Sequence, residues 1–456
     1  MSMPIPLNRS RSLLLFGLCA AGIPLLPPFG LFPLGIFCVG MVLGFFLLQG
    51  VFPEDRPFLL HLYWAGFLIR CALSLICFTS ALGHEEYTWG FLMHNDGVGY
   101  SDGAWQIALR WRSGIPFDPD TFIPESGTIG LYDYWNAWIY FWTGRNPLVM
   151  FFLNSLLGAL CIPVTYLVAG LVAGRRPART AALFTAFWPS LILWSTQNLK
   201  DTPICLAILL YVYAFIKVRK MAFGPLDVMF LCGSAAVLYL LRGVILPQLC
   251  LIATPLALIF ASSAWHRRSR FAKITIILMM CGLSLFTMGR LSDWLRSRYL
   301  DIDDLTISEW IHYSRKDRTW KAGSTIFEKA DLSSPGRIAG FLPLGILIAL
   351  FAPFPWQVAN FSQISAIPEM FIFYFLLPKA WRGFWWLVRY RWREAALMSF
   401  FSGIILVFMG LFEGNSGTIF RHRSMILCFY FVLVAAGSLY GKGQGPTTSP
   451  SPSGRG

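Results

Sequence analysis

The chain has 456 residues, of which 56% are hydrophobic, 16% aromatic and only 13% charged, and its formal net charge is +14. Soluble domains contain about 25% charged residues, so this composition excludes a cytosolic enzyme, a secreted disulfide scaffold, a coiled coil and a disordered regulator. The basic residues stand in short clusters between apolar runs, as they do in the cytoplasmic loops of membrane proteins, so the positive charge does not indicate a nucleic-acid partner.

Apolar runs long enough for a bilayer recur along the whole chain. They predict an all-α, polytopic membrane helical bundle of about 12–13 spans, since each span needs about 20 apolar residues. The predicted spans are 13–27, 31–50, 58–82, 147–172, 180–197, 202–217, 225–241, 244–263, 273–289, 338–353, 366–379, 395–412 and 424–440. The ten cysteines all lie inside apolar runs, so neither a disulfide framework nor a zinc site is expected.

Polar segments between these runs predict the organisation of the chain. It comprises an N-terminal helical hairpin at 1–57, a transmembrane core at 58–289 with a loop at 83–146, a polar loop at 290–337, C-terminal transmembrane helices at 338–440 and a disordered tail at 441–456. Basic clusters, including the one at 379–393, predict cytoplasmic loops and place loop 83–146 outside. If all thirteen predicted spans cross the membrane, the basic 379–393 cluster lies on the extracytoplasmic side, which contradicts the positive-inside rule. One segment between 290 and 379 is therefore expected to be re-entrant or interfacial.

The outer loop 83–146 is the first place to look for chemistry, because long loops are uncommon unless they are functional. It carries eight acidic and three basic residues in an otherwise basic protein. After the turn at Asn95-Asp96-Gly97, a helix on the membrane interface is expected from the spacing of Tyr100, Ala104, Ile107, Ala108 and Trp111. Asp96 at its entrance is a candidate general base or metal ligand, and the alternative is an ordinary helix N-cap.

Further charged residues are expected on the same outer face. Asp201 is predicted there, and Lys200 beside it either meets a phosphate or forms a local ion pair of little consequence. Three arginines are predicted on the outer face although the positive-inside rule disfavours them there, namely Arg242, Arg421 and Arg423. Because guanidinium groups bind phosphate bidentately, these arginines are candidates for binding the phosphate of a lipid-linked sugar. The alternative for these arginines is snorkelling to lipid head groups.

Three more residues have different expectations. Arg70 stands in the middle of a predicted span, so it is expected to face the bundle interior in a structural ion pair. His84 and His94 share the outer loop with Asp96, but their spacing is not that of a metal site. A divalent metal ion therefore stays an open alternative.

The run Asp96-xxx-Tyr100-xxx-Ala104, followed by Ser113-Gly114, resembles the first outer loop of the GT-C superfamily of membrane glycosyltransferases. That superfamily includes protein O-mannosyltransferases, lipid A aminoarabinose transferases and rhizobial lipopolysaccharide galacturonosyltransferases. The resemblance extends over about 58–217, through Tyr140-xxx-Gly144, Asn154-Ser155-Leu156-Leu157-Gly158, Pro189, Trp194-Ser195 and Leu199-Lys200-Asp201. It implies that Asp96 is the catalytic base. Since the superfamily's common Asp-Glu pair is Asp96-Gly97 here, a second carboxylate must come from Asp102 or Asp201.

The resemblance implies an inverting glycosyltransferase of a bacterial inner membrane, with its active site facing the extracytoplasmic side. A sugar would pass from a polyprenyl-phosphate donor to a glycan, lipid or protein acceptor, with Asp96 and Asp201 catalytic. The substrate would be bound by Tyr100, Asp102, Lys200, Arg242, Arg421 and Arg423. No cofactor is expected apart from a divalent metal ion, which stays an open alternative. The alternatives are a polysaccharide polymerase or ligase using a lipid-pyrophosphate donor, and a transporter or flippase, for which no internal repeat is found.

Overall fold

The structure is a computed structural model that describes residues 31–48, 51, 53–81, 95–115, 130–220, 222–241, 306–319, 325, 330–354, 356 and 361–440. The predicted all-α class is confirmed, because the regular elements in these residues are helices, apart from a single bridge between Thr325 and Asn415. The predicted spans 13–27, 244–263 and 273–289, and the predicted tail 441–456, lie outside the described residues.

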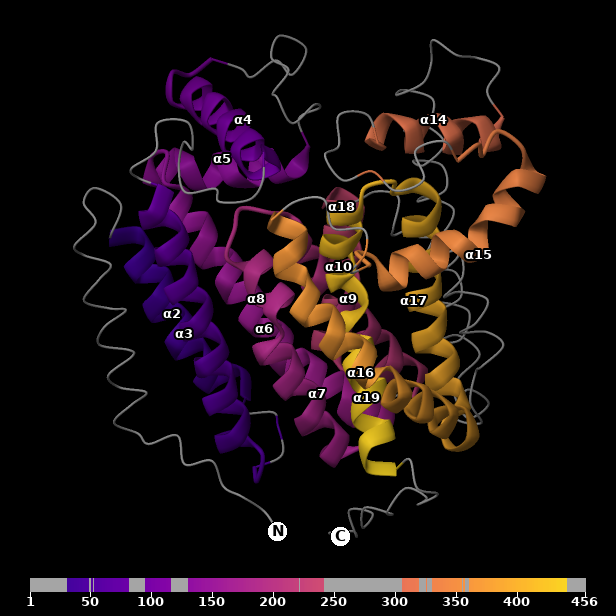
Figure 1. Ribbon diagram of the computed structural model, residues 1–456. Helices are drawn as coiled ribbons and strands as arrows, with labels where there is room; N and C mark the ends of the chain where they lie inside the picture. The colour runs from indigo at the N-terminus through magenta and orange to yellow at the C-terminus, as the bar shows by residue number, and fades with distance from the viewer. Residues whose placement is uncertain are drawn as a thin grey trace, which may run out of the picture. The chain divides into compact units, whose positions relative to one another are not determined.

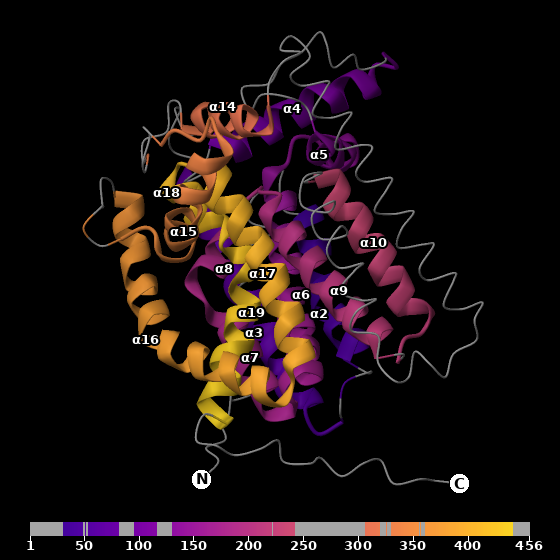
Figure 2. The same ribbon diagram turned by 90° about the vertical axis from the view of Figure 1, so that its right-hand side faces the viewer.

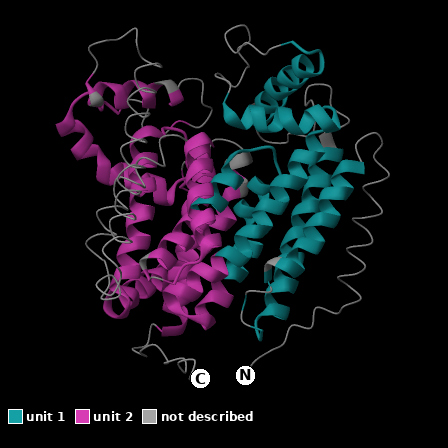
Figure 3. Cartoon of the chain, turned by 180° about the vertical axis from the view of Figure 1, so that it is seen from behind, with its two compact units in different colours: residues 1–164, 182–208 teal, residues 165–181, 209–456 magenta. Residues whose placement is uncertain are grey.

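The chain forms two compact units, residues 1–164 with 182–208 and residues 165–181 with 209–456 (Figure 3). Unit 1 contains α2 (Leu31–Leu47), α3 (Arg56–Ala81), α4 (Asn95–Arg112), α5 (Leu131–Thr143) and α8 (Pro189–Ser195). Helices α6 (Pro147–Ala173), α7 (Arg175–Phe187) and α9 (Asp201–Arg219) have residues in both units. Unit 2 contains α10 (Pro225–Leu241), α14 (Ile307–Thr319), α15 (Pro335–Phe351), α16 (Phe361–Tyr390), α17 (Trp392–Phe412), α18 (Ser416–His422) and α19 (Ser424–Tyr440).

Within the described residues, four helices are long and apolar enough to cross a membrane, namely α3, α6, α9 and α17. Helices α18 and α19 pass the same test together, although they meet at an angle of 56°. Three shorter apolar helices accompany them, α2, α10 and α15. The chain is therefore a multi-pass helical membrane protein, whereas its total number of spans and the side that each loop faces stay predictions.

The structure differs from the predicted spans at two places. The predicted span 180–197 is divided into α7 and α8, because Pro189 cannot continue a helix and Trp188 before it is extended (φ −72°, ψ 123°). The cluster at 379–393, predicted as a cytoplasmic loop, is mostly helical and belongs to the end of α16 and the start of α17. Helix α16 is bent along its length (Figure 2), and it carries Pro368 and Pro378, each of which removes a backbone hydrogen bond.

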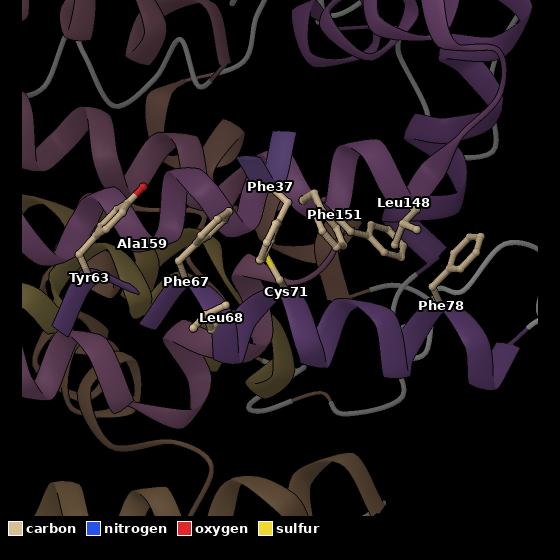
Figure 4. Packing of buried hydrophobic residues seen from close by; sticks show 10 residues of the cluster. Phe37, Tyr63, Phe67, Leu68, Cys71, Phe78, Leu148, Phe151 and Ala159 are labelled. Carbon is tan, nitrogen blue, oxygen red and sulfur yellow. The ribbon is translucent and has the colours of Figure 1, made fainter. Parts of the chain in front are cut away.

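The core of unit 1 is a set of aromatic and aliphatic side chains between α2, α3 and α6 (Figure 4). Phe67 is fully buried there and stacks on Phe37 of α2, with the ring centroids 5.8 Å apart. Tyr63 donates a hydrogen bond of 2.9 Å to the Gly40 carbonyl, which ties α3 to α2. Close packing of this kind gives α2, α3 and α6 fixed positions relative to one another.

Helices α16 and α19 of unit 2 lie side by side and approach each other through glycines. A Cβ atom built on Gly437 would overlap the Lys379 carbonyl oxygen, and one built on Gly383 would overlap the Leu433 carbonyl oxygen. Small residues let helix backbones come this close in a membrane protein. The two helices therefore depend on the missing side chains at these positions.

We expect Gly437→Ala to destabilise the protein by about 1–3 kcal/mol, because the new methyl group must push apart two backbones that cannot move independently. The measurement is the thermal unfolding midpoint in detergent. Gly403→Ala in α17 is the matched control, since a Cβ there meets nothing within 4 Å and alanine is the better helix former. Equal midpoints for the two variants would contradict the close approach of α16 and α19.

Candidate functional site

Helix α4 carries the acidic residue singled out by the sequence. It runs over Asn95–Arg112, so the helix predicted from the spacing of Tyr100 and the residues after it is confirmed, whereas Asn95-Asp96-Gly97, predicted as a turn before the helix, belongs to its first turn. Asp96 is partly buried in the first turn, where a negative charge is favoured by the helix dipole. Tyr100 follows one turn later, so the two side chains lie on the same face of α4.

Helix α5 packs against α4 with one face and leaves the other uncovered. Ala104, Ile107 and Ala108 of α4 form a buried cluster with Ala137 and Tyr140 of α5, at the end of unit 1 where α6 begins (Figure 1). The buried residues of α5 are Tyr132, Asp133, Asn136, Ala137 and Tyr140, and its large exposed residues are Leu131, Trp135, Trp138 and Trp142. The buried face of α5 is therefore the one that carries polar groups.

Asn154 of α6 holds the segment between α8 and α9 in place. Its Nδ2 donates to the carbonyl oxygens of Gln197 at 2.5 Å and Leu199 at 3.0 Å, and contacts Tyr132 Oη at 3.2 Å. Tyr132 Oη in turn donates to Asn198 Oδ1 at 2.8 Å. These bonds connect α5, α6 and residues 197–199, although the three segments are distant in the sequence.

This network brings Lys200 to α4. Lys200 Nζ lies 5.5 Å from the centre of the Tyr100 ring, and that ring meets the Tyr132 ring edge-to-face at 5.0 Å. Asp201 follows Lys200 and is 2% exposed, at the first residue of α9. The structure thus brings together Tyr100 and Lys200 from the predicted set, with Asp96 one turn from Tyr100 on α4 and Asp201 next to Lys200 in the sequence.

Asp133 belongs to the same group and was not singled out by the sequence. It is 1% exposed, and its Oδ2 accepts a hydrogen bond of 2.8 Å from the Gly130 backbone N–H at the start of α5. Burial raises the pKa of Asp133 to about 6, although the Gly130 N–H and the charge of Lys200 both act to lower it. The sequence does contain a signal for Asp133. It stands three residues after Gly130, as a residue that caps the start of a helix does, and on the face of α5 opposite the tryptophans. We call Tyr100, Tyr132, Asp133, Asn136, Asn154, Asn198, Lys200 and Asp201 the polar cluster.

The raised pKa of Asp133 predicts a pH dependence of stability. Between pH about 4 and about 6 the folded chain binds more protons at this residue than the unfolded chain, so the free energy of unfolding falls as the pH rises, by at most about 3 kcal/mol. The quantity to measure is the difference between the thermal midpoints of the wild type and of Asp133→Asn. We expect this difference to fall as the pH rises through this window and to be constant above pH about 7. A difference independent of pH would contradict the assignment.

Asp102, a predicted substrate-binding residue, forms an ion pair with Arg145 in the link between α5 and α6. The Asp102 side chain is 42% exposed and that of Arg145 is 22% exposed. The pair joins α4 to that link, beside the buried hydrogen bond of 3.1 Å between Ser101 and Tyr140. Contact of Asp102 with a substrate stays a prediction.

The predicted phosphate-binding arginines lie elsewhere in the chain. Arg421 and Arg423 are in unit 2, where they are 7% and 2% exposed at the bend between α18 and α19. Arg423 donates to the carbonyl oxygens of Ala349 and Ala352, so it is bonded within the fold. Arg242 lies outside the described residues. Contact of these arginines with a phosphate stays a prediction.

A metal site is not evident in the part of the chain that the structure describes, where no three His, Cys, Asp or Glu side chains are grouped to hold an ion. His84 and His94 lie outside that part. The residues of the polar cluster that could contribute carboxylate ligands are Asp133 and Asp201. The divalent ion stays an open alternative.

The fold and the polar cluster define a multi-pass helical membrane protein with buried carboxylates and a lysine at the start of an apolar helix. Its structure is similar to the crystal structure of ArnT from Cupriavidus metallidurans bound to undecaprenyl phosphate, with 17% sequence identity and a TM-score of 0.45. The similarity covers 81% of this chain and 59% of the ArnT chain, so this chain spans about three fifths of that length. No protein-family model matches the sequence, and a search of curated proteins gives no match.

Proposed function

We propose that this chain is a membrane glycosyltransferase that moves a sugar from a polyprenyl-phosphate donor to an extracytoplasmic glycan, lipid or protein acceptor with inversion. The observation that carries the proposal is the position of Lys200. Its ammonium group lies 5.5 Å from the centre of the Tyr100 ring, Tyr100 is one helical turn from Asp96 on α4, and Asp201 follows Lys200 in the sequence. A carboxylate that takes the acceptor proton and a cation that stabilises the leaving phosphate both assist transfer of a sugar from a phosphate.

In the proposed reaction, an acceptor hydroxyl oxygen attacks the anomeric carbon of the sugar while the bond from that carbon to the phosphate oxygen breaks. Asp96 takes the proton of the hydroxyl group, and the bonding electrons leave with the phosphate. Lys200 stabilises the charge that develops on this leaving group. Attack from the side opposite the phosphate inverts the anomeric carbon. Asp201 is the second carboxylate, Tyr100 and Asp102 bind substrate, and Arg242, Arg421 and Arg423 are proposed as further phosphate contacts.

The place of Lys200 in the fold favours a donor with a lipid tail. Asp201 begins α9, and Asp201–Val218 is one of the helices apolar and long enough to span a membrane. The site therefore adjoins the end of an apolar helix. A hydrocarbon chain in the bilayer would bring its phosphate to that end, where a lysine side chain can reach the interface.

The test is transfer of radiolabelled sugars from polyprenyl-phosphate donors by the purified chain in proteoliposomes, with an extracted envelope glycan and lipid fraction as acceptor. We expect transfer with inverted configuration at the anomeric carbon. Transfer from pyrophosphate-linked glycans alone would replace the proposal with a polymerase or ligase. Movement of the lipid across the bilayer without transfer would replace it with a flippase.

A further inference from the structure

Three side chains of the polar cluster keep buried hydrogen-bonding atoms unused. Asp133 Oδ1, Asn136 Oδ1 and Asn198 Nδ2 are inaccessible to solvent and make no hydrogen bond among the described residues. The residues themselves are 1%, 0% and 0% exposed. Buried polar atoms in native proteins are normally hydrogen-bonded, so an unused group calls for an explanation.

The three residues are held in position by their other polar atoms. Asp133 Oδ2 accepts from Gly130 N, Asn136 Nδ2 donates to the Tyr132 carbonyl at 2.7 Å, and Asn198 Oδ1 accepts from Tyr132 Oη. In each side chain, one polar atom is therefore hydrogen-bonded within the fold and the other is not. Asp133 and Asn136 lie three residues apart on α5, on the same face, and Tyr132 connects that face to Asn198.

The chemistry of these unused atoms fits a hydroxyl-bearing ring. Two are acceptors and one is a donor, and a sugar hydroxyl group can serve both. The aromatic rings of Tyr100 and Tyr132 stand beside them and offer apolar surface to the C–H groups of a ring. The charge of Lys200 acts on Asp133, so this group adjoins the proposed phosphate contact.

We propose that Asp133, Asn136 and Asn198 bind the sugar of the donor through its hydroxyl groups, and thereby distinguish a glycosylated lipid phosphate from the bare one. The inference rests on the proposed function and assigns these residues to sugar recognition, with no part in proton transfer. It predicts that their loss weakens binding of the sugar and leaves binding of the phosphate intact.

The test is equilibrium binding of radiolabelled undecaprenyl phosphate, bare or carrying glucose, galactose, mannose or arabinose, to the purified full chain in detergent. We expect the wild type to bind at least one glycosylated lipid more tightly than the bare lipid. In Asp133→Asn this preference should fall about tenfold, as expected for loss of a hydrogen bond to a charged group, while the Kd for bare lipid is unchanged. Asn198→Asp keeps the acceptor for Tyr132, replaces the unused donor and should show the same loss.

Asp227→Asn is the matched control, because Asp227 is also buried and accepts from the backbone N–H three residues earlier, Gly224, at 2.7 Å. It should keep the full preference. A preference retained in both Asp133→Asn and Asn198→Asp would overturn the inference, and so would a wild type that binds the bare lipid equally well. A wild type that binds none of these lipids would overturn the proposed function together with it. If Asp133→Asn fails to fold, Asn198→Asp decides.

Discussion

Asp96→Asn is expected to lower the turnover of sugar transfer by about a hundredfold to ten-thousandfold, the usual contribution of a general base. The amide has the size of the carboxylate but cannot take the acceptor proton, so the acceptor hydroxyl would have to attack in its less nucleophilic form. The measurement is the initial rate at saturating donor, with protein amounts matched by blot. Donor binding should change little, because Lys200 and the polar cluster are untouched.

A control separates lost chemistry from a weakened helix. Replacing an acid in a first turn also removes its interaction with the helix dipole, at a cost of about 0.3–1 kcal/mol. Glu309 lies in the first turn of α14 in unit 2 and accepts hydrogen bonds from Thr306, so Glu309→Gln makes the same kind of change at a residue outside the polar cluster. It should leave turnover unchanged. Near-normal turnover in Asp96→Asn would remove Asp96 from the mechanism.

Arg70→Met is expected to destabilise the protein by about 2–6 kcal/mol, since each of two buried acceptors left unsatisfied costs about 1–3 kcal/mol. Arg70 is 1% exposed and donates to the carbonyl oxygens of Thr185 at 3.3 Å and Ala186 at 3.1 Å, and to Ser195 Oγ at 2.9 Å. Pro189 ends helix α7 at Phe187, and Arg70 donates to these two carbonyl oxygens near the C-terminus of that helix.

Arg112 is the matched control, because it also donates to carbonyls near the end of a helix, those of Tyr140 and Phe141 in α5, but its side chain is exposed and so is its bond to Phe141. Water can replace it there, so Arg112→Met should cost less than about 1 kcal/mol. The thermal midpoints of both variants in detergent, with Arg70→Lys as an intermediate case, give the comparison. Equal losses for Arg70→Met and Arg112→Met would show that burial of the α7 carbonyls is not the cause.

The sequence by itself determined the class of the fold and the position of most helices. The apolar runs predicted at 58–82, 147–172, 202–217 and 395–412 correspond to α3, α6, α9 and α17 within a few residues. This was possible because a bilayer imposes both length and apolar composition on a span, and both are local properties of the chain. The helical spacing after Asp96 was equally local, and it located α4.

Only the tertiary structure decided which residues form the polar cluster. Asn154 reaches Leu199, and Tyr132 reaches Asn198, across 45 and 66 positions of the chain. Such contacts are fixed by how helices pack, which no periodicity within one helix encodes. Asp133 is one of eight acids in the loop 83–146, and its burial depends on how α5 packs. The sequence predicted that Arg70 faces the bundle interior, and the structure shows which carbonyl oxygens at the end of α7 accept its hydrogen bonds. Composition therefore showed that the chain lies in a membrane, whereas helix packing determined the environment of each buried polar group.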